Sequence, residues 1–289
     1  MADGLARIPL DWPHRSLSRS LEVGGLRWHV QVGGSGPAVL LLHGTGGSAH
    51  SWADVIPHLM EEATVIAPDL PGHGFTEGAA LSALTLPQIA HDLSALLARL
   101  DAPPVRVVAG HSAGAPLALR WALGDGGDQA QVVGFNPALV APPPGYMTLV
   151  APFVVPIATS MPVARGLAWF GTHTALVQGL LRSTGSTVSA AQQARYIRLF
   201  GNPEHVRGAM GLMAAADLPA LIADSSRIRF PVTFVLGEAD PWIPGRALGA
   251  VIARSFAGAT VLRWRGGHLL HEVEPERAAF LIRERLAGA

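Results

Sequence analysis

The sequence predicts an α/β protein with a mostly parallel sheet and helices on both of its faces. Short runs that are apolar at every position, such as residues 38–42 and 105–109, are typical of strands buried on both sides. Segments with helical spacing of apolar residues alternate with these runs, which is typical of parallel βαβ units. Apolar residues make up 49% of the chain and charged residues only 15%, so the chain can fill a large core.

Eight strands are expected along the chain. The first two are separated by Gly24-Gly25, a pair typical of a tight turn, and therefore predict a hairpin. The later runs are short and bounded by turn residues, as buried strands of a parallel sheet are. The expected strands are 18–23, 26–32, 38–42, 64–67, 105–109, 131–135, 231–236 and 260–264.

Helices are expected between the strands. In segment 86–100, Ile89, Leu93 and Leu97 recur at the spacing of one helical face. The other helices of the alternating pattern are expected at 51–60, 113–123, 245–255 and 276–286.

The alternation of strand and helix breaks after Pro137. Several prolines follow, and then two further segments with helical spacing, 190–200 and 204–216. We therefore expect a helical cap at 138–226, inserted after the sixth strand. The core of the protein would then consist of residues 1–137 and 227–289.

Composition excludes several classes of chemistry. The chain has no cysteine, which excludes disulfides, thiolate metal sites and a cysteine nucleophile. It also has no lysine, which excludes Schiff-base chemistry and a P-loop. Its 21 acidic and 21 basic residues balance, so no general field favours nucleic acid. No histidine cluster has metal-ligand spacing and no G-x-G-x-x-G opens a helix in the first βαβ unit, so we expect neither a metal nor a cofactor.

The pentapeptide Gly110-His111-Ser112-Ala113-Gly114 lies between an expected strand and an expected helix. This is the G-x-S-x-G pattern in the context that a nucleophile elbow requires. Side chains at either terminal glycine would collide with neighbouring elements, and the sharp turn lifts the serine hydroxyl to the carboxyl edge of the sheet. We therefore predict Ser112 as the nucleophile.

A serine nucleophile needs a base and a group that orients it. His268 follows the last expected strand, and Asp240 lies just beyond the strand before it, so both reach the sheet edge of Ser112. His271 is the rival base, one turn further on. Asn136 occupies the alternative position of the acid and carries no charge. We predict that Asp240 orients His268.

The oxyanion hole is expected to use the N–H groups of Ala113 and Thr45. Ala113 follows the nucleophile, and Thr45 lies in a glycine-rich loop after the strand at 38–42. His43, His111 and His73 are expected to be structural. Methionine adapts to irregular apolar ligands, so Met147, Met161, Met210 and Met213 are expected to line an apolar substrate pocket under the cap, with ordinary packing as the alternative.

With these motifs in place, the chain resembles the α/β-hydrolase superfamily over essentially its whole length. Within it, the chain is most similar to the magnesium-chelatase accessory proteins of bacteriochlorophyll biosynthesis. One departure is Ala216, where that group is expected to have tryptophan before Asp217. The stretches that carry the resemblance are 11–13, 25–31, 43–46, 68–76, 183–186, 210–218 and 267–272.

The resemblance implies the α/β-hydrolase fold and suggests a link to magnesium insertion into a porphyrin. The residues themselves predict a serine hydrolase acting on an ester or related carbonyl bond of an apolar or amphipathic small molecule. Two alternatives stay open. One is a non-catalytic accessory protein that binds a porphyrin intermediate or magnesium chelatase. The other is a carbon–carbon bond hydrolase or perhydrolase that uses the same triad.

Residues 129–164 carry no charged side chain and contain several prolines, which forbid a clean spanning helix. The apolar stretch that includes Phe153 and Ile157 is expected either to pack on the core or to touch a membrane surface. Residues 1–15 have no apolar signal segment. We therefore expect a cytoplasmic protein, with a peripheral contact to the inner membrane as the alternative in which that stretch touches a membrane.

Overall fold

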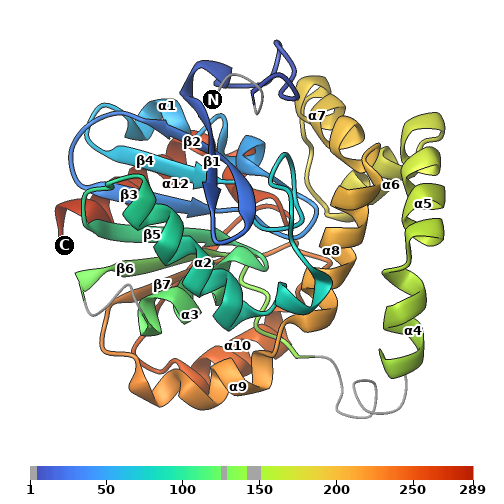
Figure 1. The fold of residues 1–289 in the computed structure, drawn as a ribbon. Helices are drawn as coiled ribbons and strands as arrows, with labels where there is room; N and C mark the ends of the chain where they lie inside the picture. The colour runs from blue at the N-terminus through green and yellow to red at the C-terminus, as the bar shows by residue number, and fades with distance from the viewer. Residues whose placement is uncertain (1–4, 125–128, 142–150, 289) are drawn as a thin grey trace.

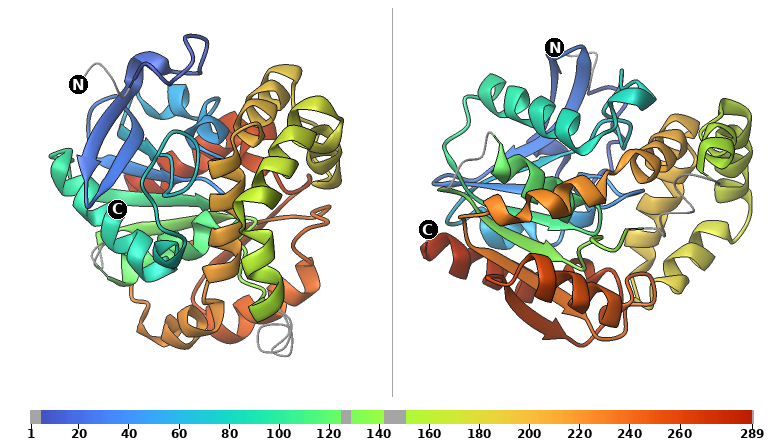
Figure 2. Two further views of the ribbon diagram at one scale, coloured as in Figure 1. Left: turned by 45° about the vertical axis from the view of Figure 1, so that its right-hand side comes forward. Right: turned by 90° about the horizontal axis from the view of Figure 1, so that it is seen from below.

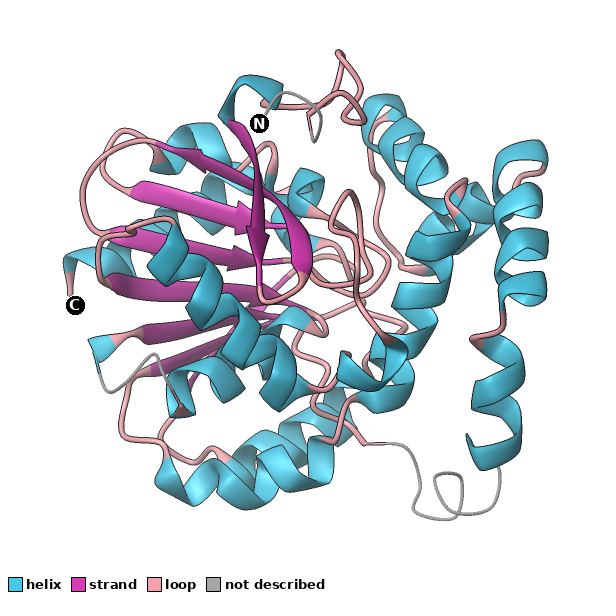
Figure 3. Ribbon diagram, in the orientation of Figure 1, coloured by secondary structure: helices cyan, strands magenta, loops and turns pink. Residues whose placement is uncertain are grey.

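The computed structural model describes residues 5–124, 129–141 and 151–288. One eight-stranded sheet runs through the molecule in the order β1-β2-β4-β3-β5-β6-β7-β8 (Figures 1 and 3). The hairpin β1–β2 is antiparallel, β2 is also antiparallel to β4, and all the other pairs are parallel. The predicted mostly parallel sheet is therefore confirmed.

The strands begin and end close to the predicted positions. Only the carboxyl end of β5 differs by more than one residue, because β5 extends to His111, directly before Ser112. The bounds are β1 Ser18–Val23, β2 Leu26–Gly33, β3 Ala38–Leu42, β4 Thr64–Pro68, β5 Val105–His111, β6 Gln131–Phe135, β7 Val232–Gly237 and β8 Thr260–Trp264.

Helices cover both faces of the sheet. Side chains of α2 (Leu86–Arg99), α3 (Gly114–Leu123) and α10 (Gly245–Ser255) belong to one hydrophobic cluster. Those of α1 (Ile56–Leu59), α11 (Leu270–Val273) and α12 (Pro275–Ala287) belong to a second cluster on the opposite face.

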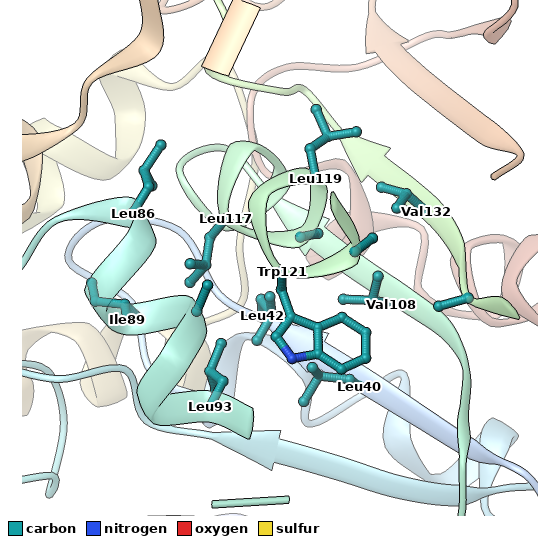
Figure 4. Packing of buried hydrophobic residues seen from close by; sticks show 14 of the residues in the cluster. Leu40, Leu42, Leu86, Ile89, Leu93, Val108, Leu117, Leu119, Trp121 and Val132 are labelled. Atoms are coloured by element: carbon teal, nitrogen blue, oxygen red, sulfur yellow. The ribbon is translucent and has the colours of Figure 1, made fainter. Parts of the chain in front are cut away.

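Strand β3 shows why its run is apolar at every position. Leu40 and Leu42 pack into the first cluster, together with Leu93 of α2 and Trp121 of α3 (Figure 4). Val39 and Leu41 pack into the second cluster. Every residue of β3 is fully buried, so a polar side chain at any position would need a buried partner.

The expected helix at 51–60 forms as two shorter pieces. A 3₁₀ turn at Ala49–Trp52 precedes α1, which begins at Ile56 with a proline in its first turn. Pro57 has no N–H group, so a continuous helix through this segment would lack a backbone hydrogen bond. The chain therefore starts a new helix there.

The helices between β6 and β7 form an insertion at the carboxyl edge of the sheet (Figures 1 and 2). Its members are α4 Ala151–Ala158, α5 Met161–His173, α6 Leu176–Ser183, α7 Ala190–Phe200, α8 Pro203–Ala215 and α9 Leu218–Ala223. Of these, α9 places Leu218 and Leu221 in the core cluster on the face of α3. The expected cap boundaries at 138 and 226 stay a prediction.

No single helix of the described residues is long and apolar enough to cross a membrane. Two bent pairs meet the length and composition test together, α4 with α5 at 61° and the segment from α8 to Arg227 at 48°.

Candidate active site

Ser112 lies in the sharp turn between β5 and α3. Its φ is +49°, a left-handed conformation that non-glycine residues seldom adopt. Backbone hydrogen bonds hold the turn, from Ser112 N to Phe135 O at 3.0 Å and to Ser112 O from Ala138 N at 3.1 Å and Ala115 N at 3.2 Å. The strained backbone therefore has the geometry expected of an elbow that presents the hydroxyl outward.

The two terminal glycines of the pentapeptide are required by close backbone contacts. A Cβ at Gly110 would lie 2.3 Å from the carbonyl oxygen of Gly114. A Cβ at Gly114 would lie 2.3 Å from the carbonyl oxygen of Leu42. Both distances are far below van der Waals contact, so the turn can form only with glycine at both positions.

His268 and Asp240 are hydrogen-bonded to each other at the same sheet edge. His268 Nδ1 lies 2.8 Å from Asp240 Oδ2, and both side chains are 2% exposed. The other carboxylate oxygen, Oδ1, accepts hydrogen bonds from the N–H groups of Trp242 at 2.8 Å and Ile243 at 3.1 Å. Backbone donors therefore fix the carboxylate in the orientation that meets the imidazole.

Ser112 and His268 line the same pocket. Within the described part of the chain the two side chains make no hydrogen bond to each other. Such contacts are often long in unliganded sites and shorten when substrate binds.

Asn136 secures the loop that carries His268, a role that sequence reasoning missed. Its Nδ2 donates to the carbonyl oxygens of Gly267 at 2.9 Å and His268 at 2.8 Å. Its Oδ1 accepts from Gly237 N at 2.6 Å. The residue is buried at the end of β6 with φ +44°. Sequence reasoning noted only that it carries no charge, although an amide at a strand end could have been recognised as a bridge between loops.

The insertion contacts the same loop through residues 183–186. His268 N donates to Thr184 O at 2.8 Å, and Leu269 N donates to Ser186 Oγ at 2.9 Å. Trp242 stacks obliquely on the His268 ring with 5.1 Å between ring centroids, and its Nε1 donates to Ser183 Oγ. The position of His268 therefore depends on the insertion as well as on the core. In the sequence, residues 183–186 are distinguished only by the family resemblance.

The loop of residues 43–47 faces Ser112 from the end of β3. Gly47 N donates to Gly44 O, while the N–H groups of Thr45 and Ala113 donate to no other described group. His43 is a structural residue of this loop, because its Nδ1 contacts Gly44 O at 2.8 Å and its Nε2 accepts from Leu70 N at 2.9 Å.

Two more elements brace this loop. His205 of α8 accepts from Gly74 N and donates to Gly46 O at 3.1 Å, and sequence reasoning did not single it out. Burial, aided by the charge of His73, lowers the pKa of both His43 and His205 to about 3. Both rings are therefore neutral at pH 7, as their acceptor roles require.

His111 lines the pocket and packs against His271, which does not line it. His111 Nε2 donates to His268 O at 2.9 Å, and its ring packs 4.3 Å from that of His271. Burial, followed by the charges of neighbouring histidines, lowers the pKa of both rings well below the usual value. Of the two candidate bases, His271 is fully buried against Trp52 and does not line the pocket, whereas His268 does.

The pocket above Ser112 is narrow, with a volume of about 40 Å³. Its wall on the insertion side is apolar, and the hydroxyl of Ser51 lines it without a hydrogen-bond partner among the described residues. The apolar wall consists of Val177, Leu180, Leu181 and Phe200 from the insertion, and Trp242 and Leu269 of the core add to it.

The three predicted methionines that the structure describes are not brought to this pocket. Met161 and Met210 are half-buried elsewhere and Met213 is 65% exposed, while Met147 lies outside the described residues. The side chains of α6 and α7 occupy the place expected for them. A larger hollow of about 480 Å³ lies between the 72–84 segment and α8, and Ser112 does not line it.

Tyr196 of α7 connects the pocket to a buried carboxyl group. Its hydroxyl donates to Glu272 Oε1 at 2.6 Å, and Glu272 Oε2 has no partner among the described residues. Burial raises the pKa of Glu272 to about 8, although the hydrogen bond from Tyr196 acts in the opposite direction. No group of three or more acidic or histidine side chains in the described residues is arranged to hold a metal.

Comparison with known proteins gives a consistent family. The sequence model of the alpha/beta hydrolase family matches residues 39–280. The magnesium-chelatase 30 kDa subunit of Rhodobacter capsulatus is 38% identical over 97% of this chain and 98% of its own length. A pimeloyl-[acyl-carrier protein] methyl ester esterase of Xylella fastidiosa is 28% identical over 83% of this chain and 91% of its own.

Solved structures show the same fold. An alpha/beta hydrolase fold protein from Burkholderia ambifaria superposes with a TM-score of 0.74 at 25% identity, covering 93% of this chain and 97% of that one. The enol-lactonase from Burkholderia xenovorans has a TM-score of 0.74 at 20% identity, covering 93% of this chain and all of the other.

Proposed function

The chain belongs to the alpha/beta hydrolase family, and from that premise we propose that it is a serine hydrolase that cleaves an ester or a related carbonyl bond. One observation carries the proposal. A serine in a strained strand–helix turn and a histidine hydrogen-bonded to a buried aspartate line the same pocket. Nothing in the packing of an α/β core requires these three residue types at these three loops.

In the proposed reaction, Ser112 Oγ attacks the carbonyl carbon of the substrate, and His268 Nε2 takes the hydroxyl proton. Asp240 holds the Nδ1–H of His268, so that Nε2 faces the serine as the acceptor. The N–H groups of Thr45 and Ala113 donate to the oxyanion that forms. His268 then returns the proton to the leaving oxygen, and the alcohol departs.

The second half of the reaction removes the acyl group from Ser112. His268 takes a proton from water, the resulting hydroxide attacks the acyl carbon, and the proton returns to Ser112 Oγ as the bond to the enzyme breaks. Removing one oxyanion donor typically lowers the rate by about 10²–10³-fold. The donor at Thr45 is its backbone N–H, so substitution of the Thr45 side chain should be tolerated.

The size of the pocket restricts the group that it can hold. Pockets for drug-sized ligands usually measure about 300–1,000 Å³. The pocket at Ser112, at about 40 Å³, is suited to a short acyl or alkoxy group in this conformation. The rest of an amphipathic substrate would extend past the half-exposed Trp242 at the rim.

A second candidate function is supported by the 38% identity with the magnesium-chelatase 30 kDa subunit over nearly the whole of both chains. On this reading the protein is an accessory of the magnesium chelation step of bacteriochlorophyll biosynthesis and binds the chelatase or a porphyrin intermediate. The two functions are compatible, because an accessory protein can also hydrolyse an ester. The site of action that goes with them is the cytoplasmic surface of the inner membrane.

A panel of p-nitrophenyl esters of increasing acyl length tests the first proposal. We expect turnover that is highest for short acyl groups and is abolished in Ser112→Ala, with the thermal unfolding midpoint unchanged. Absence of turnover throughout the panel, together with saturable quenching of the protein's tryptophans by protoporphyrin, would replace it with the accessory function. Turnover that persists in Ser112→Ala would contradict the assignment of the nucleophile.

A further inference from the structure

The insertion exposes more large apolar side chains than the rest of the described molecule. Phe153 is 74% exposed and Ile157 is 65% exposed, one turn apart on α4. Trp169 and Phe170, near the end of α5, are each more than half exposed. We call this set the apolar ridge. It consists of Phe153, Val154, Ile157, Trp169, Phe170, Leu176 and Leu180.

The ridge follows the outer edge of the molecule. Helices α4 and α5 lie farthest from the sheet in Figure 1 and in the right-hand view of Figure 2, and α5 packs inward against α7 and α8. The chain then turns at Thr174 into α6, where Leu176 continues the exposed apolar surface. Leu180, one turn later, is partly exposed and also lines the pocket above Ser112. The ridge therefore leads to the pocket.

The charged side chains on the helices that carry the ridge have one sign. The sequence contains no acidic residue between Asp128 and Glu204. Arg165 of α5 and Arg182 of α6 are exposed and form no ion pair within the described part of the chain. An apolar surface flanked by unpaired cations complements an anionic lipid surface, because the lipid head groups supply the missing negative charge.

The shape of the ridge suits an interfacial contact and excludes a simple span. The pair α4–α5 is bent by 61° at the break between the helices, and Pro156 lies inside α4. Trp169 stacks on His173 with 4.8 Å between ring centroids, which places an aromatic ring next to a polar imidazole. Aromatic side chains of this kind are enriched at the level of lipid head groups.

We propose that the apolar ridge binds the surface of an anionic lipid bilayer and so holds the mouth of the pocket against the membrane. The contact is independent of the proposed hydrolysis, since none of its residues on α4 or α5 lines the pocket. It defines the route by which an amphipathic ligand dissolved in lipid would reach Ser112, past Leu180.

Co-sedimentation with extruded vesicles tests the proposal directly. We expect the full chain to bind phosphatidylcholine vesicles that contain a third of phosphatidylglycerol. The double variant Phe153→Asp with Ile157→Asp should lower the partition coefficient by roughly 100-fold, because two large side chains lose their apolar burial. Phe280→Asp is the matched control, because Phe280 is 56% exposed on α12, outside the insertion. This substitution should leave vesicle binding unchanged.

The charge contribution is tested separately with Arg165→Gln and Arg182→Gln. We expect the pair to remove the preference for phosphatidylglycerol over pure phosphatidylcholine while leaving binding to the neutral vesicles. Ser112→Ala should bind vesicles as the wild type does, which separates this proposal from the hydrolytic one.

Three results would overturn the proposal. The wild type could fail to bind both kinds of vesicle, or the ridge variant could bind as well as the Phe280→Asp control. Light scattering could also show a dimer that the ridge variant converts to a monomer, which would assign the ridge to a second copy of the chain. Circular dichroism and turnover of a short ester establish that the ridge variant is folded.

Discussion

Asp240→Asn is the substitution for which the structure predicts the largest effect with the smallest change in shape. Asp240 Oδ1 already accepts two backbone N–H groups, from Trp242 and Ile243. An asparagine must keep its carbonyl oxygen at that position, because an amide NH₂ placed there would face two donors. Its NH₂ group is then directed at His268 Nδ1, which lies 2.8 Å from Oδ2 in the native side chain.

This reversal fixes the wrong tautomer of the histidine. Nδ1 has to accept a hydrogen bond from the amide, so the ring proton moves to Nε2 and the nitrogen that faces Ser112 can no longer take a proton. A tautomer error of this kind in a serine triad lowers kcat by roughly 10⁴-fold. That factor corresponds to about 5 kcal/mol of transition-state stabilisation.

Initial rates with a p-nitrophenyl ester that the wild type turns over provide the assay. Glu238→Gln is the matched control, since this exposed neighbour on the same loop forms no hydrogen bond or ion pair with His268 and should retain full activity. The thermal midpoint of Asp240→Asn should stay within a few degrees of the wild type, because the backbone hydrogen bonds are kept. Activity of Asp240→Asn within tenfold of the wild type would refute the assignment of the acid.

Further predictions concern the contact between the loops and the dependence of stability on pH. Gly267→Ala should lower kcat by more than tenfold, because its Cβ would lie 2.4 Å from the carbonyl carbon of Gly185 and separate the insertion from the His268 loop; activity equal to the wild type would exclude that coupling. The pKa of His205 is lowered to about 3 in the folded protein, so the unfolded state binds more protons below pH 6.5 and stability falls as the pH drops toward 3, by up to about 1.4 kcal/mol per pH unit. Urea unfolding between pH 7 and 5 should show this loss for the wild type and a smaller one for His205→Gln, and equal slopes would contradict the role of the neutral ring. The pKa of Glu272 is raised to about 8, so its contribution is complete below about pH 4.5 and is lost as the pH rises toward 8; Glu272→Gln should flatten the fall of the urea midpoint between pH 6 and 8.

Most of the fold could be predicted from the sequence because each strand is a local signal. A run such as 38–42 is apolar at every position, since both faces of the sheet are covered, and β3 begins and ends where the run does. The helix expected at 51–60 failed for a local reason as well, the missing N–H of Pro57. Local chemistry thus determines where these elements begin and end.

Part of the candidate site could also be predicted from local sequence signals, and part could not. Ser112, Asp240 and His268 follow strand ends, so the topology of the sheet brings them to one edge and sequence order is enough to find them. Asn136 and Ser186 act through hydrogen bonds to a loop that lies far along the chain. Asn136 joins core loops and Ser186 reaches the same loop from the insertion, and no periodicity in the sequence encodes contacts between segments so far apart.

Three of the four predicted methionines, Met161, Met210 and Met213, do not line the pocket for a related reason. Residue type indicates that a side chain can line an apolar pocket, and the face of the helix decides whether it does. On α8, Met213 is 65% exposed while Leu212 beside it is 1% exposed. The wall of the pocket comes instead from α6 and α7, whose apolar residues have no distinguishing sequence feature.

The central claim is that Ser112 is an activated nucleophile, and the most direct test is to locate the covalent adduct of a fluorophosphonate. Intact-protein mass spectrometry should show a single phosphonyl group per chain, peptide mapping should place it on Ser112, and the rate of labelling should fall steeply in His268→Ala. Ser112→Ala should remain unlabelled under the same conditions. An adduct on another hydroxyl, or no adduct on a folded wild-type protein, would contradict the account.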